Sequence, residues 1–393
     1  MTKLTVVIVS YNVRDYLCQC LLSVRRALQG VDGQVVVVDN HSHDGTVECL
    51  HEQFPEVTVV ASNHNLGFAR ANNIAIRQTE SEYVLLLNPD TFVGETTFRD
   101  ALAFMDQHEK AGGLGVRMLK SDGSNALESR RGLPTPAVAF YKMSGLCSRF
   151  PNSPRFGHYY MGYLPWNEPA RIEVISGAFC LLRRKALNEV GLLDEDFFMY
   201  GEDIDLSYRL LKGGFENWYL PSKILHYKGE STQKSSFRYV HVFYDAMLIF
   251  FRKHYAHASL FFSLPIKAAI YCKAFVELCR MQLQRARQSM GFVSRDKGQP
   301  PLYIVYGEHN HLEKCRHLLE GKGLEARFVE GITATHQTEQ LPKGRTVYAV
   351  YDVDAYSFSS ILDIFSQQPL RDVNMGTYLP SSNMIITTEE ILK

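Results

Sequence analysis

Hydrophobic residues recur with two different periods along the first hundred residues of the chain. Short aliphatic and β-branched runs predict buried strands at Leu4–Val9, Gln34–Asp39, Val57–Ala61 and Tyr83–Leu87. Apolar residues at helical spacing predict intervening helices over Val13–Leu28, Thr46–Gln53 and Ala69–Thr79. This alternation is typical of an α/β fold, with a mainly parallel sheet covered by helices on both faces. The carboxyl ends of such strands share one rim, which here would contain Ser10–Asn12, Asp39–Asp44 and Asn88–Asp90.

The pattern loosens from Gly112 to Pro169, where frequent prolines predict loops, short strands and a lid. Regular structure is expected again over Ile172–Arg183, followed by a helix from Arg184. A helix over Leu206–Lys212 should end at Gly213–Gly214, because glycine is a common helix C-cap. Two strand pieces are then expected, at Trp218–Leu220 and Ile224–His226.

A second, smaller α/β pattern follows a mainly helical stretch at 240–290 and a linker at 294–301. Its strands are expected at Leu302–Tyr306, Leu324–Val329, Thr346–Tyr351 and Met384–Thr387, and its helices at His311–Glu320 and Ser359–Ser366. The turn after its first strand lacks the glycines of a dinucleotide-binding motif, so we interpret this Rossmann-like unit as an accessory domain without a ligand. The predicted domains are 1–238, 239–293 and 300–393.

Composition narrows the functional classes. The length of 393 residues suggests two or three domains, and 46% hydrophobic residues with 21% charged residues is the balance of a globular chain. Lys plus Arg and Asp plus Glu both number 42, so the formal net charge is zero, which argues against a global polyanion binder such as a nucleic-acid-binding protein. Eight cysteines without a CxxC pair are typical of reduced thiols in the cytoplasm.

The apolar segments are too short or too interrupted for a membrane span. The run Val6–Val9 is shorter than a signal-peptide core of ~7–15 residues. Charged residues and Pro265 interrupt the apolar stretch Val242–Met281. Within it, Leu260–Met281 is aromatic, aliphatic and basic, which fits a helix on a membrane surface and also a helix packed on the domain with its lysines reaching solvent.

Carboxylates stand at two predicted strand ends. Asp39 could accept a hydrogen bond from the N3–H of a uracil or thymine ring. The alternative is that Asp39 and Asp44 cap the next helix, and this segment alone favours capping. Pro89 ends the fourth strand, so Asp90 should point into the cleft, where a carboxylate can hold a divalent cation together with substrate phosphates. Asn88 is neutral and could bind ribose or phosphate, although Asn-Pro-Asp is also an ordinary turn.

Two later segments carry candidate acid–base and metal-binding groups. Glu202, Asp203 and Asp205 open a predicted helix, where they could stabilise its dipole or supply a general base for an acceptor hydroxyl. His226 ends a short apolar run and is either structural or the completing ligand of a divalent site.

Together these segments resemble family 2 glycosyltransferases with the GT-A fold, and especially the bacterial rhamnosyltransferase-like branch of cell-surface polysaccharide synthesis. The resemblance covers roughly the first 230 residues. It rests on VVIVSYN (6–12), VVVDNHSHDGT (37–46), NHNLGFARANN (63–73), LLLNPDT (85–91), the segment 176–210 and HYKGEST (226–232).

The resemblance implies a role for each matching residue. The implied nucleotide-binding residues are Ser10, Asn12, Asp39, Asp44, Asn65, Gly67, Arg70 and Asn88. Asp90 and His226 would bind Mg²⁺ or Mn²⁺, with Asn in place of the first acid of the usual Asp-x-Asp motif. Asp203 matches the catalytic base and Glu202 its acidic neighbour, while Gly177 and Ala178 match the acceptor-side loop.

The implied reaction is a single displacement with inversion, from a dTDP- or UDP-linked sugar to a glycan or lipid-linked acceptor. The implied location is the cytoplasm, peripherally at the inner face of the membrane. A nucleotidyltransferase would want a glycine-rich, basic phosphate loop after the first strand, where this chain has Ser10–Asn12. A non-catalytic scaffold would have no need of Asp90, Asp203 and His226.

Overall fold

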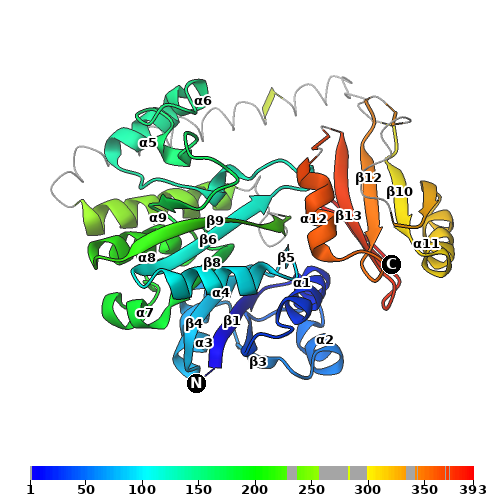
Figure 1. Ribbon diagram of the computed structural model, residues 1–393, viewed down its shortest axis with the longest axis horizontal. Coiled ribbons are helices and arrows are strands. Elements are labelled where there is room, and N and C mark those ends of the chain that lie inside the picture. The colour runs from blue at the N-terminus through cyan, green and yellow to red at the C-terminus, as the bar shows by residue number, and fades with distance from the viewer. Residues whose placement is uncertain are drawn as a thin grey trace.

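The computed structural model describes residues 2–227, 237–255, 282–283, 299–332, 341–342, 344–367, 369–370 and 372–393. Within them, a nine-stranded sheet is built from residues before 227 and a six-stranded sheet from residues after 301. Figure 1 shows the two sheets side by side, each with helices packed against it.

The first four strands of the large sheet are parallel, as the sequence pattern predicts. Their order is β3-β2-β1-β4, formed by β1 (Thr2–Ser10), β2 (Gly33–Asp39), β3 (Thr58–Ala61) and β4 (Ser81–Leu87). The intervening helices are α1 (Arg14–Ala27), α2 (Thr46–Gln53) and α3 (Phe68–Gln78). Ser10 is the register partner of Asp39, so the ends of β1 and β2 lie next to each other.

The rest of the large sheet is mixed. It continues as β4-β8-β6-β9-β5, and β7 also pairs with β9. These strands are β5 (Thr91–Val93), β6 (Ala111–Leu119), β7 (Ala170–Ile172), β8 (Phe179–Arg183) and β9 (Glu216–His226). The helices are α4 (Thr97–Gln107), α5 (Pro136–Met143), α6 (Leu146–Arg149), α7 (Arg184–Val190) and α8 (Glu202–Lys212), with short 3₁₀ turns at Leu127–Ser129 and His158–Tyr160.

The expectation of loops and short strands from Gly112 is wrong at its start, because β6 is a long strand inside the sheet. Its glycines give no strand signal, yet packing requires them: a Cβ at Gly113 would lie 2.4 Å from Cδ1 of Ile175. The two strand pieces expected after 217 are one strand, β9, whose register against β6 jumps at Pro221 and Ser222. Helix α8 begins at Glu202 instead of Leu206.

The small sheet has the order β11-β10-β12-β13-β14-β15, in which the first four strands are parallel. Its strands are β10 (Leu302–Gly307), β11 (Glu325–Glu330), β12 (Val347–Asp352), β13 (Val373–Leu379), β14 (Met384–Ile386) and β15 (Ile391–Leu392), and its helices are α11 (His309–Gly321) and α12 (Phe358–Gln367). The sequence pattern missed β13, whose Asn374, Gly376 and Thr377 interrupt its apolar run.

The two sheets are joined by a shared hydrophobic cluster. The rings of Phe92 on β5 and Phe358 on α12 lie 5.0 Å apart between centroids. The carboxylate of Glu95 accepts hydrogen bonds from the backbone N–H groups of Phe358 (2.8 Å) and Ser359 (2.9 Å), so it caps α12 from the other unit. Met375 N donates to Ser121 O at 2.7 Å. The small sheet therefore packs directly behind the loop that follows β6.

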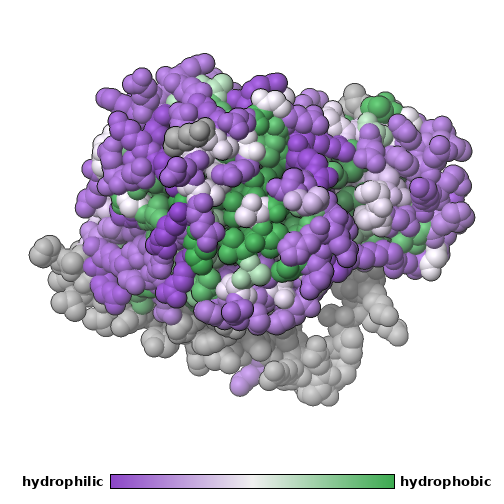
Figure 2. All heavy atoms as spheres, turned by 90° about the horizontal axis from the view of Figure 1, so that it is seen from below, coloured by the Kyte–Doolittle hydropathy of each residue, from purple (hydrophilic) through white to green (hydrophobic). Residues whose placement is uncertain are grey.

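The outer surface is mainly hydrophilic on the face seen from below in Figure 2, with a band of hydrophobic residues through its middle. Helix α9 (Phe237–His254) is described, whereas residues 228–236, the expected membrane-surface helix at 258–281 and most of the expected linker lie outside the described residues. None of the helices in the described part of the chain has the length and apolarity needed to cross a membrane.

Candidate active site

A cavity of about 410 Å³ opens at the carboxyl ends of the central strands of the large sheet. The strand ends and following turns contribute Val9, Asn40 and Asn88. The turn before β8 and the start of α8 contribute Ser176–Ala178 and Glu202–Asp203. The remaining wall includes Met118, Lys120, Ala126, Glu128, Arg131, Lys142, Tyr159 and Tyr160. The cavity thus brings together segments that are distant in the sequence.

Three candidate metal-site residues meet at one edge of this cavity. The β5–β9 pairing sets Thr91 opposite His226, which places the preceding Asp90 beside the imidazole. Nε2 of His226 lies 3.3 Å from Oδ1 of Asp90 and 3.3 Å from Nδ2 of Asn88. Asp90 is 1% exposed. A carboxylate, an amide and an imidazole form a donor set that fits Mg²⁺ or Mn²⁺ when substrate phosphates supply further oxygens.

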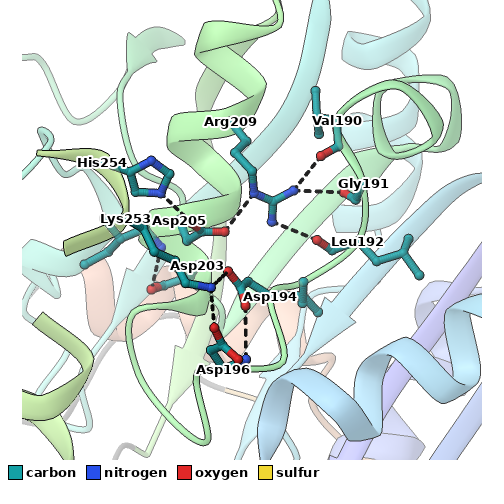
Figure 3. Close-up of polar contacts among 12 residues, drawn as sticks. Val190, Gly191, Leu192, Asp194, Asp196, Asp203, Asp205, Arg209, Lys253 and His254 are labelled. Carbon is teal, nitrogen blue, oxygen red and sulfur yellow. Dashed lines mark hydrogen bonds and ion pairs between the residues drawn. The ribbon is translucent and has the colours of Figure 1, made fainter. Parts of the chain in front are cut away.

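The three acids at the start of α8 have different surroundings. Asp205 is buried between Arg209 (2.7 Å) and Nε2 of His254 (2.6 Å), as Figure 3 shows. The guanidinium of Arg209 also donates to the backbone oxygen of Leu192 at 2.7 Å. Asp205 therefore holds α8 against its neighbours, while Glu202 and Asp203 line the cavity.

Asp203 is fixed by contacts from three segments. Its carboxylate accepts hydrogen bonds from the guanidinium of Arg131, from Ile204 N at 2.8 Å and from Gly177 N at 3.3 Å. Arg131 also donates to Ile175 O at 3.0 Å. Asp203 is thereby positioned next to the Gly177–Ala178 turn, within reach of a molecule in the cavity.

Glu202 is buried beside Asp203 and differs from it in its partners. The residue is 6% exposed, and its Oε2 atom has no hydrogen-bond partner among the described residues. Burial, followed by the nearby charge of Asp203, raises the pKa of Glu202 far above its ordinary value. Glu202 therefore favours its protonated form, in which it can donate a hydrogen bond.

Two orphaned polar atoms lie at the end of β1 and β2. Asp39 accepts a hydrogen bond from Ser42 N at 3.0 Å through Oδ2, whereas its buried Oδ1 and the buried Oγ of Ser10 have no partner among the described residues. Asn65, which lines the cavity, accepts from Asn40 Nδ2 at 3.1 Å and from Gly67 N at 2.9 Å. These atoms could bind a polar ligand without breaking an existing hydrogen bond.

Of the eight implied nucleotide-binding residues, Asn65 and Asn88 line the cavity, and the other six, including Ser10 and Asp39, do not. Asp44 accepts a hydrogen bond from Arg14 N at 2.9 Å, so it caps the start of α1. The sequence-based alternative, in which Asp44 caps the helix that follows it (α2), is therefore wrong. Asn12 Oδ1 accepts from His43 N at 2.8 Å. Arg70 is half exposed and pairs with Glu195 at 3.3 Å. Gly67 allows close approach, because a Cβ there would lie 2.4 Å from Phe198 O.

The sequence motifs did not point to Arg131, Lys142, Tyr159 or Tyr160. They lie in the proline-containing stretch, where no strand or helix period marks them. Arg131 and Asp203 are separated by 72 residues in the chain, so only the fold shows that they pair.

A second cluster of His311, Asp352 and Asp354 lies at the strand ends of the small sheet, with ligand atoms within 4.8 Å of one another. Its groups already have partners: Asp352 contacts Nδ1 of His311 at 2.7 Å, and Asp354 pairs with Arg26 at 3.1 Å. It belongs to the other sheet and does not line the cavity.

Comparison with known proteins adds the family relationship. Residues 5–191 match the family model described as Glycosyl transferase family 2. The chain is 30% identical over 262 residues to N-acetylglucosaminyl-diphospho-decaprenol L-rhamnosyltransferase of Mycobacterium tuberculosis strain H37Rv, which covers 63% of this chain and 83% of that protein. It is 29% identical over 138 residues to poly(ribitol-phosphate) beta-N-acetylglucosaminyltransferase TarS of Staphylococcus aureus strain Mu50, covering 34% of this chain and 23% of TarS.

A solved structure, S. aureus TarS 1–349 in complex with UDP-GlcNAc, is also similar. The TM-score is 0.44 at 21% sequence identity, covering 63% of this chain and 65% of the other, slightly less than two thirds of its length.

Proposed function

This chain belongs to glycosyl transferase family 2, and from that premise we propose that it moves a hexosyl or deoxyhexosyl group from a nucleoside-diphosphate sugar to an acceptor in cell-surface polysaccharide synthesis. It is a glycosyltransferase with the mixed α/β, helix-flanked sheet of the GT-A fold. The mycobacterial relative carries a rhamnosyltransferase name, and TarS an N-acetylglucosaminyltransferase name, which supports a dTDP- or UDP-linked donor.

In the proposal, the nucleotide lies over the ends of β1 and β2. The orphaned Oδ1 of Asp39 would accept from the base N3–H, with the Ser10 hydroxyl beside it. Asn65 and Asn88 line the cavity and would contact the ribose or phosphates.

Asp90, His226 and Asn88 would hold Mg²⁺ or Mn²⁺ at the donor diphosphate. Such an ion, when bound, neutralises charge that grows on the departing nucleoside diphosphate. The protein's own contribution is to keep these donors together through the β5–β9 pairing and the backbone bond from Tyr227 N to Asp90 O at 3.0 Å.

Asp203 is the proposed general base. It takes the proton of the acceptor hydroxyl as that oxygen forms a bond to the anomeric carbon, while the bond from that carbon to the diphosphate oxygen breaks on the opposite face. The result is inversion at the anomeric carbon. Arg131 and Gly177 N hold the carboxylate in place, and the Gly177–Ala178 turn lies on the acceptor side.

One observation carries this proposal: Asn88, His226, Glu202 and Asp203 line one cavity, and Asp90 contacts His226 behind it. Incubating purified protein with nucleotide sugars and Mn²⁺ tests it, because an enzyme of this kind releases nucleoside diphosphate slowly even without acceptor. Release by wild type but not by Asp90→Ala would support the enzyme over a non-catalytic scaffold. Release of inorganic pyrophosphate from a nucleoside triphosphate would favour a nucleotidyltransferase.

We also propose that the protein works at the inner face of the membrane on a lipid-linked or glycan acceptor. The basis is the relative that acts on a decaprenol-linked substrate by name, together with the aromatic, aliphatic and basic composition of residues 258–281. Sedimentation of the full chain with anionic and with neutral vesicles tests this: binding should require the anionic lipid and weaken with salt.

A further inference from the structure

Lys142 on α5 reaches the same cavity as Asp203 and is held there by two tyrosines. Its ammonium nitrogen donates to the hydroxyl of Tyr160 at 2.7 Å and lies 3.4 Å from the ring centroid of Tyr159. The ring centroid of Tyr160 is 4.3 Å away. The lysine is therefore a positioned, partly desolvated cation in the cavity wall.

Lys142 has no acidic partner among the described residues, in contrast to Lys3, Lys223 and Lys253, which each pair with at least one carboxylate. Burial, followed by the nearby Arg131 guanidinium, lowers the pKa of Lys142 to about 7. The charge of Arg131 is balanced by its contact with Asp203. Lys142 is thus a partly buried cation of the cavity wall without a carboxylate partner among the described residues, whereas Lys120, which also lines the cavity, is exposed.

We propose that Lys142 and the Tyr160 hydroxyl bind a phosphoryl group of the acceptor, so that the acceptor is a phosphate- or diphosphate-linked saccharide. The inference rests on the proposed function and adds the chemical class of the acceptor. Lys142 is assigned to the acceptor side because its charged neighbour Arg131 pairs with Asp203. The donor phosphates have their own site at Asn88, Asp90 and His226.

The charges of the cavity support this division. Glu202 favours its neutral form and Asp203 is paired with Arg131, while Glu128, Lys120 and Lys142 also line the cavity. An approaching phosphate can therefore meet a cation at Lys142. The mycobacterial relative is named for a diphospho-decaprenol-linked substrate, which has the charge that this wall would recognise.

Calorimetric titration of the full chain tests the inference with geranyl diphosphate as the probe and geraniol as its phosphate-free match. UDP or dTDP with Mn²⁺ is first added to saturation, which fills the donor site. Wild type should then bind geranyl diphosphate and not geraniol. Lys142→Met should weaken that binding about tenfold or more, the size of a lost charge-assisted hydrogen bond. Lys142→Arg should retain most of it.

Lys185→Met, on the exposed side of α7, is the matched control and should bind like wild type. Raising the pH from 7 to 8.5 should weaken binding to wild type more than binding to Lys142→Met, because Lys142 loses its charge as the pH rises through its pKa of about 7. The charged and titratable groups that face Lys142 are Arg131, Tyr159, Tyr160 and Cys147, and burial raises the pKa of Tyr160 to about 12.

Equal binding by wild type and Lys142→Met, or no binding by wild type with the donor site filled, would overturn the acceptor-phosphate site. Failure of UDP and dTDP to bind wild type is a separate result that contradicts the proposed function itself.

Discussion

The two sheets of this protein have similar parallel strand arrangements but use their strand ends differently. In the large sheet, polar groups at the strand ends face a cavity, and Oδ1 of Asp39 and Oγ of Ser10 have no partner in the described chain. In the small sheet, Asp352 at the end of β12 contacts His311 and accepts from Asp354 N at 3.0 Å. A strand-end carboxylate is thus a sign of a ligand site when its oxygens lack partners, and not by its position alone.

The small sheet also differs in that residues at its strand ends contact the unit that contains the large sheet. Asp354 pairs with Arg26 on α1, and Arg26 also donates to Val353 O at 2.6 Å. Tyr227, directly after His226, packs in the cluster that both units share. We infer that the small sheet supports the proposed metal edge from behind.

The largest effect on the rate of transfer should come from Asp203→Asn. We expect transfer to fall by about 10³-fold, since a positioned general base contributes roughly 10²–10⁴-fold. The matched change in the small sheet, Asp354→Asn, should leave the rate within twofold. Initial rates of nucleoside diphosphate release with acceptor present would show this. Near-normal turnover by Asp203→Asn would show that the base is another group.

Asp90→Ala should have the next largest effect. Loss of the buried carboxylate should weaken nucleotide binding in Mn²⁺ by about 10–100-fold and raise the Mn²⁺ concentration needed for half-maximal binding. Asp352→Ala removes an equally buried carboxylate from the small sheet and should leave nucleotide affinity unchanged. Calorimetric titrations at several Mn²⁺ concentrations would separate the two. A metal response that survives in Asp90→Ala would place the cation elsewhere.

Glu202→Gln should change how stability depends on pH. Because the folded-state pKa of Glu202 is raised above the ordinary 4.5, the folded protein holds a proton that the unfolded chain releases. The resulting stability is present below pH 4.5 and is lost as pH rises through the folded-state pKa. Glu202→Gln should remove at least about 1 kcal/mol of this pH-dependent change in the free energy of unfolding, since one pKa unit is worth about 1.4 kcal/mol. Urea unfolding of both proteins from pH 5 to 9 measures this change. Equal pH dependence of the free energy of unfolding in wild type and Glu202→Gln would contradict the prediction.

Glu95→Ala should have the smallest effect. It removes the cap that joins the units at the start of α12, which typically costs about 1 kcal/mol. We expect a lower unfolding midpoint and unchanged nucleotide affinity, with exposed Glu320→Ala as the neutral control. A loss of nucleotide affinity in Glu95→Ala would show that the two units are more tightly coupled than their contacts indicate.

The sequence predicted the parallel half of the large sheet well, because strands buried on both faces appear as continuous apolar runs. It also placed Asp90, Asp203 and His226 on segments that the fold brings to one cavity edge or wall. It failed at β6, where glycines that pack against Ile175 erase the strand signal.

Site residues from the stretch between β6 and β7 could not be predicted. Arg131 and Lys142 lie in no recognisable local motif. Their positions in the site depend on partners elsewhere in the chain, Asp203 for Arg131 and Tyr160 for Lys142. Asp44 and Arg70 show the opposite case, since their motif positions suggest ligand contact while their side chains have structural partners. Their assigned roles stay predictions.

The most direct test is a thermal-shift screen of nucleotide sugars, with and without Mn²⁺, on wild type, Asp203→Asn and Asp90→Ala. Ligand that binds only the native state raises the unfolding temperature. We predict that at least one dTDP- or UDP-sugar stabilises wild type and Asp203→Asn equally in Mn²⁺, and stabilises Asp90→Ala much less. No shift with any nucleotide sugar, or the same shift in Asp90→Ala, would contradict the donor site described above.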